Sequence, residues 1–173
     1  MLFRSARRSP RYPTVEVRVA DVCLDVSTAV LVAGLARALV ATALAEARQG
    51  TPVAAAPAPQ VAAALAAAAR HGLAGAGADP VTGQAVDALT LRSRLLDHVR
   101  PALSDHGDTQ IITGLLRRLD DRGTGADRQR ALFTSAASTP AFITALARAT
   151  LSGYEPGRWR RPDARVPAAA GAR

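Results

Sequence analysis

The chain has 173 residues, a net charge of +8 at pH 7 and a sequence pI near 11.4. All 22 basic residues are arginine, alanine supplies 40 positions, and aromatic residues make up only 3%. A single cysteine excludes a disulfide framework and a cysteine-based zinc site. The abundance of alanine favours a mostly helical chain with a core of small aliphatic side chains.

No apolar run is expected to reach the roughly 20 residues of a membrane-spanning helix, and the N-terminus shows no secretory pattern. We therefore expect a soluble protein of the reducing, cytoplasmic compartment, without a membrane partner. The positive charge lies mainly at the two ends, where residues 1–20 and 154–173 each carry five arginines. These ends predict a basic segment over residues 1–12 and a disordered basic tail over residues 154–173.

Residues 14–20 read Thr-Val-Glu-Val-Arg-Val-Ala, a strict alternation that is typical of a strand. Its valines would lie on one face, with Glu16 and Arg18 on the other. It is the one strand that the pattern predicts. Because a single strand cannot satisfy its own backbone hydrogen-bonding groups, we expect its neighbouring strands to come from outside the chain.

The rest of the chain shows helical spacing, interrupted by a loop at 50–59 and a turn at 79–83. Ser27, Asp108 and Thr139 are expected to begin helices, because their side chains suit N-cap positions. The prediction is therefore one N-terminal strand followed by five or six helices, over residues 27–48, 60–71, 86–105, 108–121, 125–137 and 139–153.

Glu16 and Arg18 are the main candidate for chemistry. Two residues apart on a strand, they project from one face about 7 Å apart. This spacing suits a carboxylate that holds Mg²⁺ beside a guanidinium that reaches a phosphate. The alternative is a solvated ion pair on an exposed strand, which contributes little to stability.

Other reactive residues lack the spacing that their chemistry needs. The three histidines have no metal-ligand spacing and are expected at exposed helix ends, at His71, His98 and His106. Cys23 is expected to be a small buried apolar group. The glycines between 72 and 83 resemble a phosphate-binding loop only loosely, because a Walker-type loop needs a lysine.

Three blocks of the sequence resemble, in order, the carboxylate–amine ligases related to glutamate–cysteine ligase type 2. The first is Pro10-Arg-Tyr-Pro-Thr-Val-Glu-Val-Arg-Val-Ala-Asp-Val-Cys23. The second is Arg70-His-Gly-Leu-Ala-Gly75 with Asp79-Pro-Val-Thr-Gly83, and the third is Asp97-His-Val-Arg-Pro-Ala-Leu103 with residues 122–130. The resemblance covers roughly residues 10–152.

This resemblance implies an α+β, glutamine-synthetase-like fold whose antiparallel sheet cradles ATP, Mg²⁺ and glutamate. It also implies that ATP phosphorylates a carboxylate and that an amine, such as cysteine, then displaces phosphate to form an amide. Glu16 matches the family's strand glutamate that holds Mg²⁺. Arg18 matches the arginine that binds ATP and neutralises the transferring phosphoryl group, a catalytic role.

Two departures from the family's pattern argue against an enzyme that is active alone. The family is about twice as long, so residues 13–153 correspond to the C-terminal part of its catalytic domain. Ala66 and Ala67 stand where the family commonly has Trp-Arg. We therefore expect a C-terminal fragment that is inactive alone and needs its N-terminal half or another copy.

Two alternatives stay open. The chain could instead be a non-catalytic helical module that binds a partner or, less expected, nucleic acid through its arginine-rich ends. It could also be a truncated reading frame without function.

Overall fold

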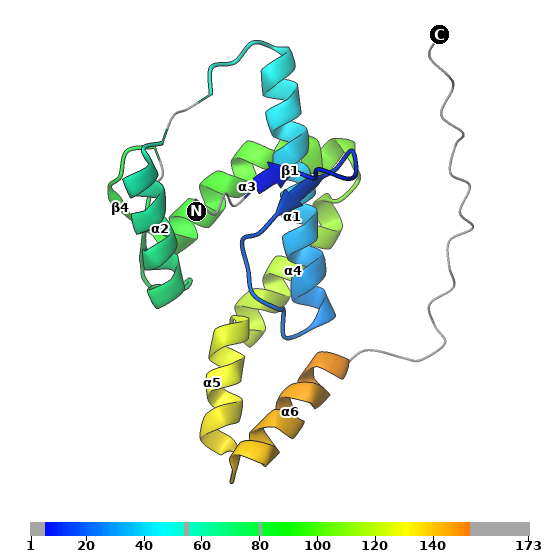
Figure 1. Ribbon diagram of the computed structural model, residues 1–173, viewed down its shortest axis with the longest axis vertical. Helices are drawn as coiled ribbons and strands as arrows, with labels where there is room; N and C mark the ends of the chain where they lie inside the picture. Colours follow the sequence, from blue (N-terminus) through cyan, green and yellow to red (C-terminus); the bar gives the residue numbers. More distant parts are fainter. Residues whose placement is uncertain (1–5, 54–55, 80, 153–173) are drawn as a thin grey trace, which may run out of the picture.

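The computed structural model describes residues 6–53, 56–79 and 81–152. Helices dominate this part of the chain, as the composition predicts, and two short hairpins interrupt them (Figure 1). The elements in chain order are β1 (Ala6–Arg8), β2 (Val15–Val17), α1 (Val26–Arg48), α2 (Ala58–His71), β3 (Ala76–Ala78), β4 (Ala85–Asp87), α3 (Ala88–Asp105), α4 (Thr109–Arg122), α5 (Gly125–Ser135) and α6 (Thr139–Leu151).

The predicted strand forms, but it is shorter and has a partner within the chain. Only Val15–Val17 of residues 14–20 are β-strand, and they pair antiparallel with β1 in the register Arg7↔Glu16. The expectation of a single strand was therefore wrong: part of the basic N-terminal segment forms β1. The alternation that identified β2 is missing from Ala6–Arg8, so sequence pattern gave no signal for it.

A second hairpin, β3–β4, was also not predicted. The turn at 79–83 joins its strands, and the Asp79 carboxylate accepts hydrogen bonds there from the backbone N–H groups of Val81 and Thr82. Gly83 has a φ of 71°, which a glycine adopts without strain. Because residues 85–87 belong to β4, the next helix begins at Ala88 rather than at residue 86.

The three predicted N-caps, Ser27, Asp108 and Thr139, differ in detail from those in the structure. Helix α1 begins at Val26, because Asp25 rather than Ser27 is its N-cap. Ser138, not Thr139, caps α6. Asp108 does occupy the N-cap position of α4, but its side chain makes no capping hydrogen bond and instead pairs with Arg37 of α1.

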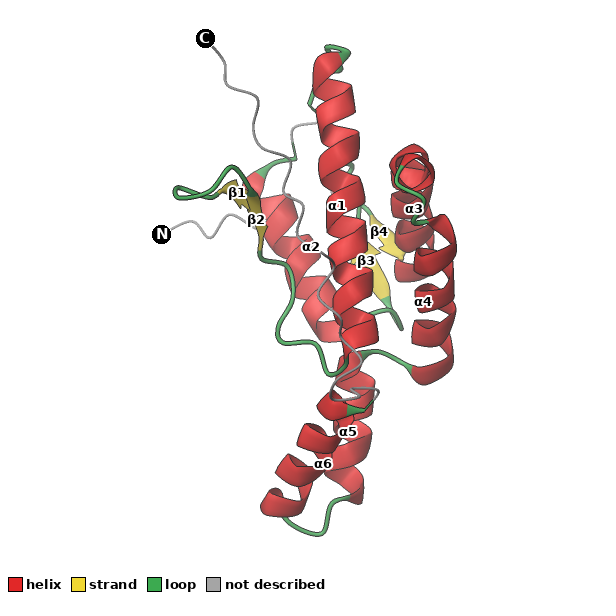
Figure 2. Ribbon diagram, turned by 90° about the vertical axis from the view of Figure 1, so that its right-hand side faces the viewer, coloured by secondary structure: helices red, strands yellow, loops and turns green. Residues whose placement is uncertain are grey.

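The core lies where α1 packs against α3 and α4 (Figure 2). Val99 of α3 is fully buried, and Gly34 of α1 faces Ile112 of α4 so closely that a Cβ on Gly34 would lie 2.5 Å from the Ile112 Cδ1 atom. Small residues on α1 therefore let the helices approach. The buried cluster comprises Leu31, Ala38, Val99, Ala102, Leu103 and Ile112.

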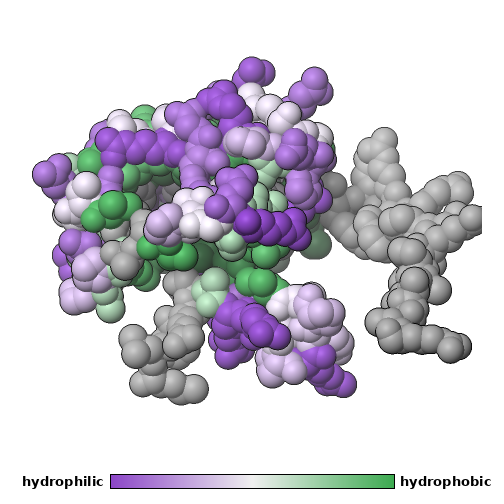
Figure 3. All heavy atoms as spheres, turned by 90° about the horizontal axis from the view of Figure 1, so that it is seen from above, coloured by the Kyte–Doolittle hydropathy of each residue, from purple (hydrophilic) through white to green (hydrophobic). Residues whose placement is uncertain are grey.

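Much apolar surface stays exposed in the described part of the chain, and hydrophobic residues are visible among hydrophilic ones in Figure 3. Helix α1 is long and apolar enough to cross a membrane by length and composition, although little of it is buried. The expectation that no run reaches this length was therefore wrong, because alanines and small aliphatic residues extend the apolar stretch. Core helices of soluble proteins have the same properties.

Helices α5 and α6 form a hairpin at one end of the molecule, away from the α1–α3–α4 bundle (Figures 1 and 2). The rings of Phe133 and Phe142 meet edge to face, with centroids 5.3 Å apart. Thr124 and Asp127 form a capping box that fixes the start of α5. The hairpin is thus stabilised largely by its own contacts and caps.

Replacing Val99 with alanine tests the position of the core. Because Val99 is fully buried between the helices, the cavity left by Val99→Ala should lower the free energy of unfolding by about 2 kcal/mol. Urea unfolding followed by circular dichroism measures this change. Val22→Ala is the control: Val22 is exposed, so its change should stay within about 0.5 kcal/mol. Equal effects of the two variants would contradict this core.

Candidate functional site

The structure brings the two predicted site residues together on the first hairpin. Glu16 lies in β2 and Arg18 directly follows that strand. The Arg18 Nε atom donates a hydrogen bond of 2.5 Å to Glu16 Oε1, and the Arg7 Nε atom donates one of 2.6 Å to Glu16 Oε2. Both carboxylate oxygens of Glu16 therefore contact an arginine.

Arg7 is a member of this cluster that sequence reasoning missed. It lies directly across from Glu16 in the β1–β2 register, so the pairing of the strands brings it there. Arg7 could have been identified only if residues 6–8 had been predicted as a strand, and their sequence shows no strand pattern. The cluster holds two cations and one anion, so it retains a net positive charge.

Electrostatics keep Glu16 ionised. Its hydrogen bonds with Arg7, and then with Arg18, lower the pKa of the Glu16 carboxyl below its ordinary value. All three side chains are substantially exposed, so this geometry is the solvated ion pair that the sequence left open as an alternative. A cation that binds Glu16 therefore competes with two guanidinium groups for this carboxylate.

The residues fit Mg²⁺ only in part. Within the described ranges, no group of three or more histidine, cysteine or acidic residues lies close enough to hold a metal ion. Glu16 is a suitable hard oxygen ligand, but Mg²⁺ prefers six oxygens and is held through carboxylates, phosphates and water together. Glu16 can therefore be one ligand of a Mg²⁺ site whose other ligands come from elsewhere.

An apolar groove of about 740 Å³ lies beside the cluster, between β2 and α1. On the hairpin side it is lined by Val15, Val17 and Val19, whose side chains alternate with those of Glu16 and Arg18. On the α1 side it is lined by Val32, Val40 and Leu44, among others. The hairpin therefore carries the charged cluster on one face and an exposed apolar surface on the other.

The remaining candidates do not join this cluster. His98 lies in the middle of α3 rather than at a helix end, whereas His71 ends α2 and His106 follows the last residue of α3. Cys23 is only partly buried and lines the groove between β2 and α1. Gly72, with a φ of 55°, is the C-cap residue directly after α2.

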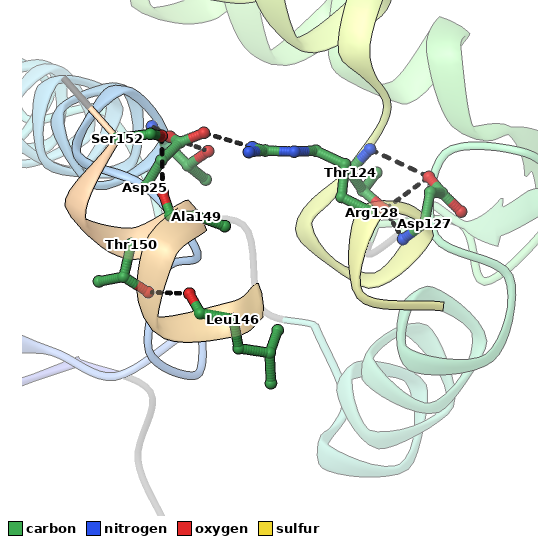
Figure 4. Close-up of polar contacts among 9 residues, drawn as sticks. Asp25, Thr124, Asp127, Arg128, Leu146, Ala149, Thr150 and Ser152 are labelled. Atoms are coloured by element: carbon green, nitrogen blue, oxygen red, sulfur yellow. Dashed lines mark hydrogen bonds and ion pairs between the residues drawn. The ribbon is translucent and has the colours of Figure 1, made fainter. Parts of the chain in front are cut away.

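Asp25 anchors the segment that follows the hairpin. One of its carboxylate oxygens accepts a hydrogen bond of 2.8 Å from the backbone N–H of Thr28, which caps α1. The other oxygen pairs with Arg128 of α5, 103 residues away (Figure 4). Burial raises the pKa of Asp25, but the hydrogen bonds from Thr28 and Arg128 outweigh this effect and lower the pKa to about 2.

Acid should weaken this anchor. The pKa of Asp25 is about 2 in the folded state, and its ordinary value is 3.8. The stabilisation that its carboxylate gives the folded state is therefore present above about pH 4 and is lost as the pH falls toward about 2. The shift corresponds to about 2 kcal/mol. Asp25→Asn keeps a capping oxygen but removes the charge. Urea unfolding should show the variant about 2 kcal/mol less stable at pH 6, and the difference should shrink between about pH 4 and pH 2.

Asp97→Asn is the matched control, because Asp97 forms an exposed pair with Arg100 one helical turn away. This variant should change the free energy of unfolding by no more than about 0.5 kcal/mol at every pH. A stability difference between wild type and Asp25→Asn that does not change with pH would contradict the anchor.

The Glu16 cluster predicts a change that NMR can measure. Arg7→Gln removes the hydrogen bond that lowers the Glu16 pKa most, so this pKa should rise toward its ordinary value. A carbon-detected titration of the Glu16 side chain measures the shift. Arg8→Gln, a change on the same strand at a residue that pairs with Val15, should leave the Glu16 pKa unchanged. No rise with Arg7→Gln would show that Arg7 does not contact Glu16 in solution.

Comparison with known proteins identifies the family. The model of the glutamate–cysteine ligase family 2 matches residues 5–149. The chain is 46% identical over 138 residues to "Putative glutamate--cysteine ligase 2-2" of Frankia alni, covering 77% of this chain and 35% of the relative. It is 44% identical to the protein of that name from Saccharopolyspora erythraea, covering 88% and 39%.

A third relative, "Putative glutamate--cysteine ligase 2-1" of Nocardia farcinica, is 40% identical over 156 residues, covering 90% of this chain and 41% of the relative. The chain thus spans 35% to 41% of the length of these three relatives. No solved structure matches it, so the glutamine-synthetase-like fold stays a prediction. Its sequence, matched over most of its length, places the chain in the glutamate–cysteine ligase family 2.

Proposed function

We propose that this chain supplies part of the nucleotide site of an ATP-dependent carboxylate–amine ligase. Its family membership carries this proposal, because the family's activity requires a MgATP site and the residues matched by resemblance, Glu16 and Arg18, lie together on one hairpin. The acid substrate would be glutamate and the amine an amino acid such as cysteine. The location would be cytoplasmic.

In such a site the two residues have distinct tasks. Glu16, which the neighbouring arginines keep ionised, would hold Mg²⁺. Arg18 would bind the γ-phosphate of ATP and neutralise charge during phosphoryl transfer, a reaction that depends mainly on positioning and electrostatic stabilisation. For both to act, Glu16 and Arg18 must exchange their mutual contact for contacts with the ion and the nucleotide.

The ligase site would be completed by polypeptide that this chain does not contain. Glu16 offers one carboxylate, whereas a MgATP site needs several ligands. We place the missing part of the ligase on the groove between β2 and α1, where Val15, Val17 and Val19 of the hairpin side and Leu44 of α1 are exposed in the described structure. Relatives of which this chain matches 35% to 41% contain enough additional chain to fill it.

Complementation tests the proposal. The chain is purified with and without the part of the Frankia alni relative that it does not match, and ADP release is measured with MgATP, glutamate and a panel of amino acids. The combined chains should release ADP in a glutamate-dependent reaction, and Glu16→Gln or Arg18→Gln should reduce it at least tenfold. The chain alone should show no turnover, because its site is incomplete.

Arg11→Gln is the control, since Arg11 lies on the same hairpin and packs over the Tyr12 ring instead of joining the Glu16 cluster. Its ADP release should equal that of the unmodified chain. Glutamate-dependent turnover by the chain alone, or micromolar MgATP binding by it, would contradict the proposed incomplete site. Self-association that restores turnover would identify a second copy as the occupant of the groove.

Binding of nucleic acid through the arginine-rich ends stays a prediction. Among the described residues, Arg7 of the basic N-terminal segment and Arg18 after it both pair with Glu16 rather than face a phosphate backbone together. The predicted basic tail, residues 154–173, lies outside the described residues.

A further inference from the structure

A second cleft, of about 670 Å³, lies between the last turns of α1, the first half of α3 and the β3–β4 turn. Its lining includes residues 51–53, which follow α1, and Figure 1 labels α1 and α3, the two helices that contribute most of the rest. Its lining shares no residue with the groove between β2 and α1. It is therefore separate from the Glu16 cluster.

The wall of this cleft on α3 is one continuous helix face. Leu91, Arg94, Leu95 and His98 line it at spacings of three and four residues, which places them on the same side of the helix. Leu91 and Leu95 form an apolar strip beside the polar strip of Arg94 and His98, because residues four apart lie one above the other on a helix. Ala43 and Ala47 of α1 line the opposite wall, and their small size leaves room for a ligand.

Arg94 is held in place by a buried carboxylate. Its Nη1 atom donates a hydrogen bond of 2.6 Å to Asp79 Oδ2. The Asp79 Oδ1 atom accepts hydrogen bonds from the backbone N–H groups of Val81 and Thr82, at 2.8 and 3.0 Å. These hydrogen bonds from the β3–β4 turn hold Asp79 in place. The Arg94 side chain is nevertheless 58% exposed, so donors of its guanidinium remain accessible from the cleft.

An anionic group lies on the other wall. Glu46 of α1 lines the cleft, and its Oε1 atom is 3.8 Å from His98 Nε2, too far for a hydrogen bond. Its side chain is 41% exposed. The cleft therefore presents a positioned cation on α3 and an accessible carboxylate on α1, and both line it together with the two leucines.

We propose that this cleft binds a free α-amino acid with a large apolar side chain. The Arg94 guanidinium binds the carboxylate of the amino acid, Glu46 binds its ammonium group, and Leu91 and Leu95 contact its side chain. A ligand that carries one positive and one negative group matches a cleft lined by both a cation and carboxylates. A purely anionic ligand would be repelled by Glu46 and Asp79. This inference does not depend on the ligase function proposed above.

Four ligands separate the contributions of the three groups. Binding of L-phenylalanine, N-acetyl-L-phenylalanine, L-phenylalanine amide and glycine to the full chain is followed by chemical-shift titration of its amide signals. L-phenylalanine should shift signals of α3 and bind at least tenfold more tightly than the other three. N-acetylation removes the ammonium group, amidation the carboxylate, and glycine the apolar side chain.

Two variants assign the contacts. Glu46→Gln should lower the affinity for L-phenylalanine about tenfold and leave the affinity for N-acetyl-L-phenylalanine unchanged. Arg94→Gln should lower the affinity for L-phenylalanine and leave the affinity for L-phenylalanine amide unchanged. Arg100→Gln, on the same helix but paired with Asp97 outside the cleft, is the matched control and should bind all ligands as before. Circular dichroism checks that each variant is folded.

The ligand series by itself keeps the proposal testable if Arg94→Gln fails to fold. No binding of L-phenylalanine, or equal affinity for L-phenylalanine and its two blocked forms, would overturn the proposal. Loss of affinity for both blocked ligands in Glu46→Gln would also overturn it, because that result would show a change of shape rather than a lost charge contact. None of these results bears on ADP release.

Discussion

Helix α1 packs closely on α3 and α4 because small residues line the contact. Gly34 leaves room for the side chain of Ile112, and Ala38 is buried one helical turn further along α1. Val99 of α3 fills the centre of this contact and is fully buried. The other described elements are attached to this three-helix unit: the hairpins flank it, and α5 and α6 extend from the end of α4 (Figures 1 and 2).

The same small side chains limit how much this unit can bury. Alanine offers little apolar area, so close helix contact is obtained with a small core and with large exposed apolar residues on α1 and β2. The chain matches 35% to 41% of the length of three relatives, and the proposed ligase function would place further polypeptide on these exposed faces. The groove between β2 and α1 is where the proposed ligase partner would bind.

Carboxylates that pair with arginine serve different ends according to their burial. Asp25 and Asp79 are buried, accept backbone N–H groups at a helix start and a turn, and hold Arg128 and Arg94 in place. Glu16 is exposed and contacts only side chains, so an ion or a nucleotide can replace its partners. The first two are suited to positioning and the third to binding.

The sequence alone predicts the helices and the family of this chain. Helical spacing and terminal glycines such as Gly72 and Gly123 depend on local backbone preferences, which act within a few residues. The alternation around Glu16 and Arg18 likewise predicted that they share a face, whereas a role for them in a MgATP site is implied only by the resemblance to the family. These features need no information about distant parts of the chain.

The contacts between residues far apart in the sequence depend instead on the tertiary structure. Strand pairing brings Arg7 to Glu16, and the packing of α5 brings Arg128 to Asp25, 103 residues away. Helix packing likewise brings Glu46 of α1 and Arg94 of α3 into the lining of one cleft, where Arg94 pairs with Asp79 of the β3–β4 turn. Such contacts depend on how helices and strands are arranged in space, and a periodic pattern within one segment carries no information about that arrangement.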